Sequence, residues 1–424
     1  MNKTRIIILL TCLSFSSNVF SQEQDGKNAI EQLEAIKQEN EVQSEAIKNL
    51  QKLKLSGYIQ AQYQWGEEDA SLKIGAPNEN PEKPFNRIGI RRGRIKFSYE
   101  EGITSGVFQL DITEKGVGIK DAYFNLKDPW LKTSSLKVGV FDRPFGNEIS
   151  YSSSQRESPE RSTIFQTLFP EERDLGAMIT LQPKKNSLLH FLKLETGLFA
   201  GNGIKQETDS RKDFIGHLSA IKKGDNIQIG GGVSYYNGSV YQGSENVYRM
   251  KNGGFFPDSR LENKGKFARR EYIGLDAQFV MKSPLGATRL RGEYLFGKQP
   301  GTRSGSNSPN ASTLPSSDTY IRNFNGGYAI LVQEIGRSPF SAVFKYDWYD
   351  PNTKIAANNL GLSNMDKGDI AVNTLGLGLL WNLNTSLLLQ AYYEINSNEK
   401  TENLAAWHAD RNDNVFTLRI QYKF

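Results

Sequence analysis

The sequence predicts an all-β transmembrane fold, a sixteen-stranded antiparallel β-barrel preceded by a short N-terminal coiled-coil helix. Three observations predict it. From Leu53 to Phe424, apolar and polar residues alternate in segments of about ten residues, the length of a tilted membrane-spanning strand. The connections between these segments alternate between short and long. No apolar run is long enough for a transmembrane helix, so strands must do the spanning.

Composition excludes several classes of function. The chain has 424 residues, with 52 Lys plus Arg against 47 Asp plus Glu, and no basic tract. This balance argues against a nucleic-acid partner. Cys12 is the only cysteine, so neither a disulfide nor a cysteine-based metal site can form, and we expect no cofactor.

Residues 1–21 have the pattern of a secretory signal peptide. Lys3 and Arg5 form a basic start, Ile6 to Phe15 an apolar core, and Ser21 a small residue before Gln22. A lipoprotein interpretation of Cys12 would cut the apolar core in half, which disfavours it. Removing the peptide takes away two basic residues and leaves 50 basic against 47 acidic residues. The mature chain is therefore expected to be exported and free of cysteine.

The next segment, residues 22–52, is predicted to be a periplasmic helix. It contains apolar residues on alternating three- and four-residue steps, broken in the middle by two polar residues: Leu33, Ile36, Asn40, Gln43, Ile47 and Leu50. This is the a/d pattern of a coiled coil, and the polar residues could fix its register or strand number. A single solvated helix, or a disordered tether, is the alternative.

Residues 53–424 are predicted to be the barrel, and its first strand shows the pattern. Leu55, Ile59 and Trp65 share the apolar face of Leu53–Trp65, and Gln60 and Gln64 share the polar face. The alternation recurs in Arg94–Tyr99, Val107–Thr113, Lys120–Leu126, Leu136–Phe141, Leu175–Leu181, Ile227–Tyr235, Tyr272–Met281, Arg289–Phe296, Phe340–Tyr349, Thr374–Trp381, Leu387–Glu394 and Val415–Phe424.

Connection lengths give the count and the orientation of the strands. Short links such as Ser283–Gly286 alternate with long ones such as Gly238–Lys266 and Gly297–Asn325, and counting hairpins gives about sixteen strands. Short periplasmic turns and long extracellular loops are typical of an outer-membrane β-barrel. Aromatic residues near the strand ends, on the apolar face, favour this over a soluble sandwich, whose outward face would be polar. We therefore expect a lipid bilayer around the chain and a location in the outer membrane of a Gram-negative bacterium.

One long connection, Pro144–Glu172, differs from the rest. It mixes charge with apolar anchors, among them Phe145, Phe165 and Phe169, and a disordered loop would be poorer in such residues. We expect it to pack against another part of the protein; a mobile surface insertion is the alternative.

Several motifs resemble the phosphate-selective porins O and P. They occur in the order of that family: FNRIGIRRGRIKF from Phe85, KDAYFNL, KVGVFDRPFGNE, SPERS, EERDLG, FKYDWYDPNT from Phe344, and the ending LRIQYKF. The resemblance implies a sixteen-stranded homotrimeric pore whose third long loop, here 144–172, folds into the lumen. The ending with Phe424 is similar to the signal that outer-membrane insertion machinery recognises. The family's name implies phosphate as a solute.

Basic residues on the polar face are the candidates for lining the pore and selecting anions. They are Arg92, Arg94 and Lys96 on one strand, Arg289 and Arg291 on another, and Lys120 on a third. The loop contributes Arg143, Arg156, Arg161 and Arg173. Rings of Arg or Lys select anions in known pores. Acids oppose them, namely Asp111, Asp121, Asp276, Glu293, Asp347 and Glu394, so cross-strand pairing that merely solvates the wall is the alternative.

Two other classes of function compete with a porin. An enzyme is disfavoured because His190, His217 and His408, the three histidines, fit no nucleophile-elbow or metal-ligand spacing. A structural tether, in which residues 28–54 grip the cell wall and the barrel is only an anchor, fits the long loops as well as a pore does. The expected function is thus an outer-membrane porin for small hydrophilic solutes, with the tether as the alternative.

Overall fold

The structure is a computed structural model that describes residues 32–424 except positions 131 and 356. The chain separates into two units, Met1–Lys54 and Leu55–Phe424. Where it is described, the first unit is a helix of residues 32–51, and the predicted signal peptide lies outside the described residues. Within the described part of the chain, no helix is both long and apolar enough to cross a bilayer.

The second unit is built from strands, with one short α-helix and four single-turn 3-10 helices in its loops. The strands are β1 (Leu53–Gly66), β2 (Phe85–Glu101), β3 (Thr104–Thr113), β4 (Gly116–Lys127), β5 (Ser135–Asp142), β6 (Arg173–Leu181), β7 (Leu192–Phe199), β8 (Asp213–Lys223), β9 (Ile227–Tyr241), β10 (Asn246–Lys251), β11 (Gly254–Ser259), β12 (Phe267–Ser283), β13 (Gly286–Gly301), β14 (Thr319–Glu334), β15 (Phe340–Asp350), β16 (Val372–Asn382), β17 (Leu387–Asn398) and β18 (Val415–Lys423). The helices are α2 (Thr163–Leu168), η1 (Leu261–Asn263), η2 (Ala357–Asn359), η3 (Lys367–Asp369) and η4 (Ala405–Trp407).

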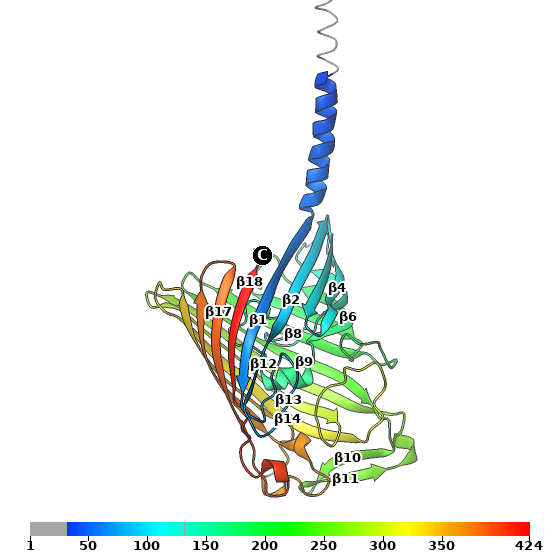
Figure 1. The fold of residues 1–424 in the computed structure, drawn as a ribbon. Coiled ribbons are helices and arrows are strands. Elements are labelled where there is room, and N and C mark those ends of the chain that lie inside the picture. The colour runs from blue at the N-terminus through cyan, green and yellow to red at the C-terminus, as the bar shows by residue number, and fades with distance from the viewer. Residues whose placement is uncertain (1–31, 131, 356) are drawn as a thin grey trace, which may run out of the picture. The chain divides into compact units, whose positions relative to one another are not determined.

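The sheet closes on itself, as Figure 1 shows. β1 pairs antiparallel with β18, from Tyr58 opposite Lys423 to Gly66 opposite Val415. β9 pairs directly with β12, so β10 and β11 form a hairpin outside the ring. Sixteen of the eighteen described strands therefore make the barrel, which confirms the predicted fold class.

Side chains alternate between the two faces of the wall as predicted. On β1, Gln60, Gln62 and Gln64 are buried inside, whereas Leu55 and Ile59 are exposed outside. The outward face of the other strands is likewise apolar and exposed, with Phe97, Phe124, Leu175, Leu218, Leu290, Leu331, Phe344, Leu377, Leu418 and Ile420 among its members. An apolar exterior around a polar interior is the pattern of a barrel that spans a membrane.

Two details differ from the sequence prediction. The loop predicted at Gly238–Lys266 contains the β10–β11 hairpin, whose turn residues Asn252 and Gly253 both have positive φ, 50° and 78°. Asn-Gly favours such a turn, so the sequence does carry a local signal for this hairpin. In addition, β2 begins at Phe85 rather than at Arg94, because its alternation breaks at Arg91 and Arg92 and hides the first half of the strand.

Candidate functional site

The loop between β5 and β6, called the inner loop (Pro144–Glu172), packs onto the inward face of the barrel wall. Phe145, Ile149, Phe165 and Phe169 are at most 1% exposed. They join one apolar cluster with inward residues of β9, β12, β13 and β14, namely Tyr236, Tyr272, Leu295, Phe324, Tyr328, Ile330 and Val332. Burying aromatic rings in such a cluster fixes the loop.

Polar contacts pin the first turn of the inner loop to the same wall. The backbone N–H of Gly146 donates to Ser234 Oγ at 2.9 Å, and that of Glu148 donates to the Glu293 carboxylate at 2.6 Å. Gly146 has φ of 60°, and a side chain there would collide with the Glu293 carboxylate. The Glu148 carboxylate in turn accepts from Lys345 on β15 at 3.2 Å. The turn is therefore held by both backbone and side-chain partners.

The tip of the inner loop reaches the opposite wall. The hydroxyls of Tyr58 and Ser153 lie 2.6 Å apart, and Gln60 donates to the Ser153 carbonyl at 2.9 Å. Gln421 donates to the carbonyl of Ser154 at 3.0 Å. These partners belong to β1 and β18, which lie across the ring from β9 and β12. The inner loop thus contacts opposite sides of the closed sheet.

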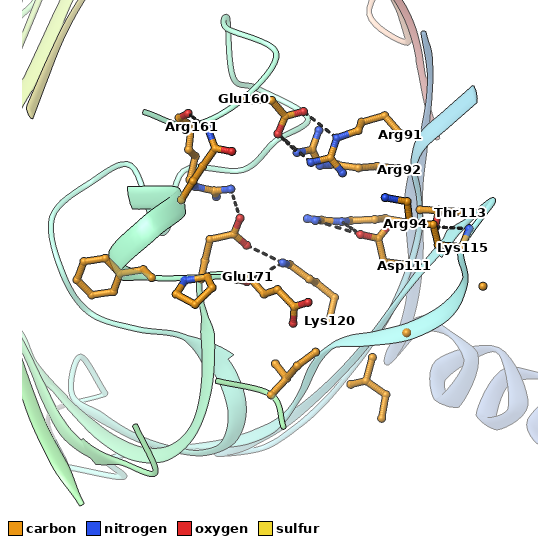
Figure 2. Close-up of a pocket in the computed structure, with 18 of the residues that line it drawn as sticks. Arg91, Arg92, Arg94, Asp111, Thr113, Lys115, Lys120, Glu160, Arg161 and Glu171 are labelled. Carbon is orange, nitrogen blue, oxygen red and sulfur yellow. Dashed lines mark hydrogen bonds and ion pairs between the residues drawn. The ribbon is translucent and has the colours of Figure 1, made fainter. Parts of the chain in front are cut away.

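Open space remains between the inner loop and the wall formed by β2, β3 and β4. A cavity of about 670 Å³ lies there, shown in Figure 2. A second cavity of about 270 Å³ is lined by Gly57 and Phe424, at the end of the barrel that carries the short turns. Arg94 and Arg161 line both cavities. The two cavities therefore both border these two guanidinium groups, and the region between Arg94 and Arg161 is called the junction.

Most charged groups around the junction are paired. Glu160 accepts from Arg91 at 2.8 and 2.9 Å and from Arg92 at 2.8 Å. Arg94 meets Asp111, its predicted partner, at 3.4 Å. The Glu172 carboxylate binds Lys120 at 2.6 Å and also pairs with Arg161, and Arg173 binds Asp121 at 2.9 Å.

At one point in each of two strands, the alternation of side chains is interrupted and two adjacent charged residues both face inward. In β2, Arg91 and Arg92 both reach Glu160, although alternation would send one of them outward. In β4, the register against β3 shifts between Gln109 and Leu110, and Lys120 and Asp121 are both buried inside. The register shift in β4 is a bulge, which re-aims side chains, and in β2 the phase of side-chain burial changes between Arg91 and Arg92; both features concentrate charge beside the junction.

Both cavities keep an excess of positive charge. The larger is lined by seven basic side chains and four carboxylates, and the smaller by five basic side chains and two side-chain carboxylates. Among the described residues that line these cavities, Lys96, Lys115, Lys205 and Lys423 form no ion pair, and neither do the carboxylates of Glu171 and Asp142. An anion passing between the cavities would meet more unpaired lysines than unpaired side-chain carboxylates.

Comparison with solved structures identifies the architecture. The structure is similar to the outer membrane channel DcaP of Acinetobacter baumannii, with 14% sequence identity and a TM-score of 0.52, over 88% of this chain and 97% of that chain. It is similar to Salmonella typhi OmpF, solved in complex with daunomycin, at 12% identity and a TM-score of 0.54, over 88% and 97% of the two chains. The trimer form of OmpT, an outer membrane protein of Vibrio cholerae, matches at 9% identity and a TM-score of 0.51, over 88% and 99%.

The fold is that of the outer-membrane porins. No protein-family model matches the sequence, and no curated protein matches it. The resemblance to the phosphate-selective porins O and P thus rests on the motifs quoted above. The similarity to solved structures shows a porin fold and does not identify the solute.

Within this porin fold, the predicted site residues separate into two groups. Arg92, Arg94, Lys120 and Arg161 line the larger cavity, and Arg94, Lys96, Arg161 and Arg173 line the smaller one. These residues are brought together, and their role in selectivity stays a prediction.

The other predicted residues lie away from both cavities. Arg143 is buried against the Phe169 ring, 4.0 Å from Asp174. Arg156 is buried and donates to the carbonyl oxygens of Ser158 and Pro159. Arg156 and Arg291 line a separate cavity of about 240 Å³ between the inner loop and β12–β14, so the expectation that Arg156 faces the water path stays a prediction. Arg289 pairs with Glu334 and Arg291 with Glu157, on the far side of the loop.

Basic neighbours lower the pKa values of two carboxyl groups in the inner loop. Burial disfavours ionisation of Glu160, but Arg91, Arg92, Arg156 and Arg419 hold its pKa well below the ordinary value of 4.5. Burial likewise opposes the charge of Glu172, and Arg161, Lys120 and Arg173 lower the pKa of that carboxyl well below the same value. Both carboxylates therefore stay ionised at neutral pH and hold the loop to the basic wall.

Three lining residues were missed by sequence reasoning. Arg91 continues the inward parity of the first half of β2, where Ile88 and Ile90 are exposed outward, but it is out of phase with the predicted ladder of Arg92, Arg94 and Lys96. Lys115 lies in the short link between β3 and β4, and Lys205 lies in the loop between β7 and β8. Neither has a periodic pattern to place it, because the conformation of a loop is set by tertiary contacts.

Proposed function

We propose that this chain is an outer-membrane porin of a Gram-negative bacterium that passes small hydrophilic solutes with a preference for anions. The observation that carries this proposal is the excess of basic over acidic side chains in both cavities beside the inner loop. A water-filled pore screens charge over about 8 Å at physiological salt, so charges count most where the path is narrow. Arg94 and Arg161, which line both cavities, are the charges that we place nearest to that position.

Phosphate is the anion that the motif resemblance favours, and the site chemistry is compatible with it. Guanidinium groups bind phosphate oxygens in pairs, and lysine supplies a compact charge. Arg94, Lys96 and Arg161 offer both groups beside the junction. The acids that hold the arginines in place also repel anions, so the expected preference is modest.

Recording from a planar bilayer tests this proposal. The purified protein should give discrete conductance steps, and a potassium chloride gradient should give a zero-current potential of the sign set by chloride permeation. Added phosphate should reduce the chloride current if phosphate occupies the junction. A cation-selective potential would overturn the anion preference, and an absence of steps would overturn the porin itself.

The helix of residues 32–51 bears on two hypotheses, namely that the chain forms a homotrimer and that the helix tethers the barrel to the cell wall. Its Leu33, Ile36, Ile47 and Leu50 are more than half exposed, as expected of a helix whose apolar stripe meets another copy. We infer a homotrimer that residues 22–52 stabilise on the periplasmic side.

Deleting residues 28–52 should lower the melting temperature of the oligomer and leave the single-channel conductance unchanged, because the apolar stripe would lose its partners. The measurement is semi-native electrophoresis after heating, with the conductance as the control. An oligomer that melts as wild type does would favour the alternative, in which this helix only tethers the barrel to the cell wall.

A further inference from the structure

A third cavity, unrelated to the pore, lies where β8, β9 and β12 meet the long loops. It has a volume of about 580 Å³, and its lining includes Arg211, Lys212, Lys266, Phe267 and Arg269. None of its lining residues, all of them in the described part of the chain, is acidic. This surface is called the basic rim site.

The basic rim site faces away from the lumen. Arg270 and Asp213 pair with each other in the interior, where their side chains are at most 3% exposed. Arg269 adjoins Arg270 on β12, so alternation directs it outward, and Lys212 directly precedes Asp213, the first residue of β8. Their side chains are 59% and 45% exposed. Solutes inside the barrel therefore cannot reach this site.

Along these strands, the outward surface passes from apolar to aromatic to basic residues. Leu218, Val233 and Leu275 form exposed apolar surface on β8, β9 and β12. Next come the rings of Phe214 and Tyr235, whose centroids lie 6.5 Å apart. Aromatic rings of this kind mark the boundary between hydrocarbon and headgroups.

The basic row lies beyond that aromatic boundary. Arg269 lies four residues, about 13 Å, beyond Ile273, which pairs with Tyr235. Lipid headgroups occupy this depth just outside the hydrocarbon of a bilayer. The cations are thus positioned at the level of the headgroups.

The cations of the basic rim site are incompletely neutralised. Lys212 pairs with Glu207, Arg269 with Glu271 at 2.5 Å, and Lys266 lies 3.6 Å from Glu262. All of these pairs are solvent-exposed, and exposed ion pairs contribute little, so a better anion can replace them. The guanidinium of Arg211 stacks on the Phe267 ring at 4.8 Å and has no carboxylate partner among the described residues. The site therefore favours a dense anionic group.

We propose that the basic rim site binds the phosphorylated headgroup of a glycolipid in the outer leaflet. Arginine fits phosphate through paired N–H donors, and basic pockets at the edge of a membrane span bind anionic headgroups. The acyl chains of the same lipid would lie along the apolar strip below. This inference rests on membrane insertion of the barrel, as proposed above.

Native mass spectrometry of the detergent-solubilised oligomer tests the inference, with a bisphosphorylated lipid A and its dephosphorylated form of equal acylation as probes. The phosphorylated form should bind at least tenfold more tightly. The variant Arg211→Gln, Lys212→Gln, Arg269→Gln should lose that difference. The variant Lys222→Gln, Lys223→Gln, Lys282→Gln carries the same charge change near the short turns and should retain it.

Further measurements separate the alternatives. Wild-type conductance in all variants shows that they are folded and inserted, so a failed porin and a failed lipid site are distinguishable. Inorganic phosphate at equal ionic strength should not displace the lipid; if it does, the site holds free anions instead. Equal lipid affinity of the rim variant and wild type would overturn the proposal. A change of oligomeric state without a change in lipid binding would also overturn it, because it would indicate that a second copy of the chain occupies the site.

Discussion

At the scale of single residues, pairing decides which charges can act on a solute. The sequence placed a basic ladder on the polar face and left open whether acids neutralise it. In the structure, Arg92 and Lys120 are tied to carboxylates of the inner loop. Lys96, Lys115 and Lys205 have no such partner among the described residues. The paired arginines thus hold the inner loop, and the unpaired lysines supply the positive charge that can act on a solute.

The attachment of the inner loop to the barrel wall depends most on Glu160. Its carboxylate faces Arg91 and Arg92, with Arg419 at 3.4 Å. The variant Glu160→Gln would leave buried guanidinium groups uncompensated, and removing one partner of a buried pair costs about 3 kcal/mol or more. We expect a lower thermal midpoint at pH 7, measured by loss of β-sheet circular dichroism.

Acid should abolish the difference between Glu160→Gln and wild type. The pKa of Glu160 is held below its ordinary value of 4.5, so its stabilising effect is complete above that pH and is lost as the pH falls further. The control is Glu79→Gln, which removes an exposed carboxylate paired with Arg87 and should change little. Equal midpoints for Glu160→Gln and wild type at pH 7 would contradict the account.

At the scale of elements, the inner loop and the strands differ in how far sequence could predict them. Apolar anchors such as Phe165 and Phe169 mark the loop as one that packs, and both are buried. The wall that receives them could not be read from alternation, because Tyr272 and Leu295 occupy inward positions where a water-filled pore would have polar residues. Only the folded partner explains them.

Shortening the inner loop should widen the path. Deleting Ser152–Arg161 removes the tip that contacts β1 and β18 and one side of the junction with Arg94. We expect single-channel conductance to rise severalfold in planar bilayers. Deleting residues 79–83, exposed in the loop between β1 and β2, is the control and should leave conductance unchanged. An unchanged conductance after the first deletion would place the inner loop outside the ion path.

At the scale of the whole molecule, the repeating period of two residues specified the barrel, and irregularities specified the site. Sixteen strands with alternating turn lengths followed from the pattern, since one apolar face must meet lipid along every strand. The change of burial phase at Arg91–Arg92 and the bulge at Lys120–Asp121 break that period and could not be predicted from it. The division of the lumen into cavities on either side of the inner loop likewise depends on where that loop lies.

The most direct test of the central claim is the zero-current potential of a variant whose unpaired cations are reversed. Lys96→Glu, Lys115→Glu, Lys205→Glu changes residues that line the cavities and form no ion pair within the described part of the chain, so the loop contacts should survive. Lys184→Glu, Lys185→Glu, Lys222→Glu carries the same charge change in exposed residues near the short turns. In a potassium chloride gradient, wild type and the control should show anion preference, and the cavity variant should reverse the sign of the potential. A cavity variant with the wild-type potential would show that these cations do not set selectivity.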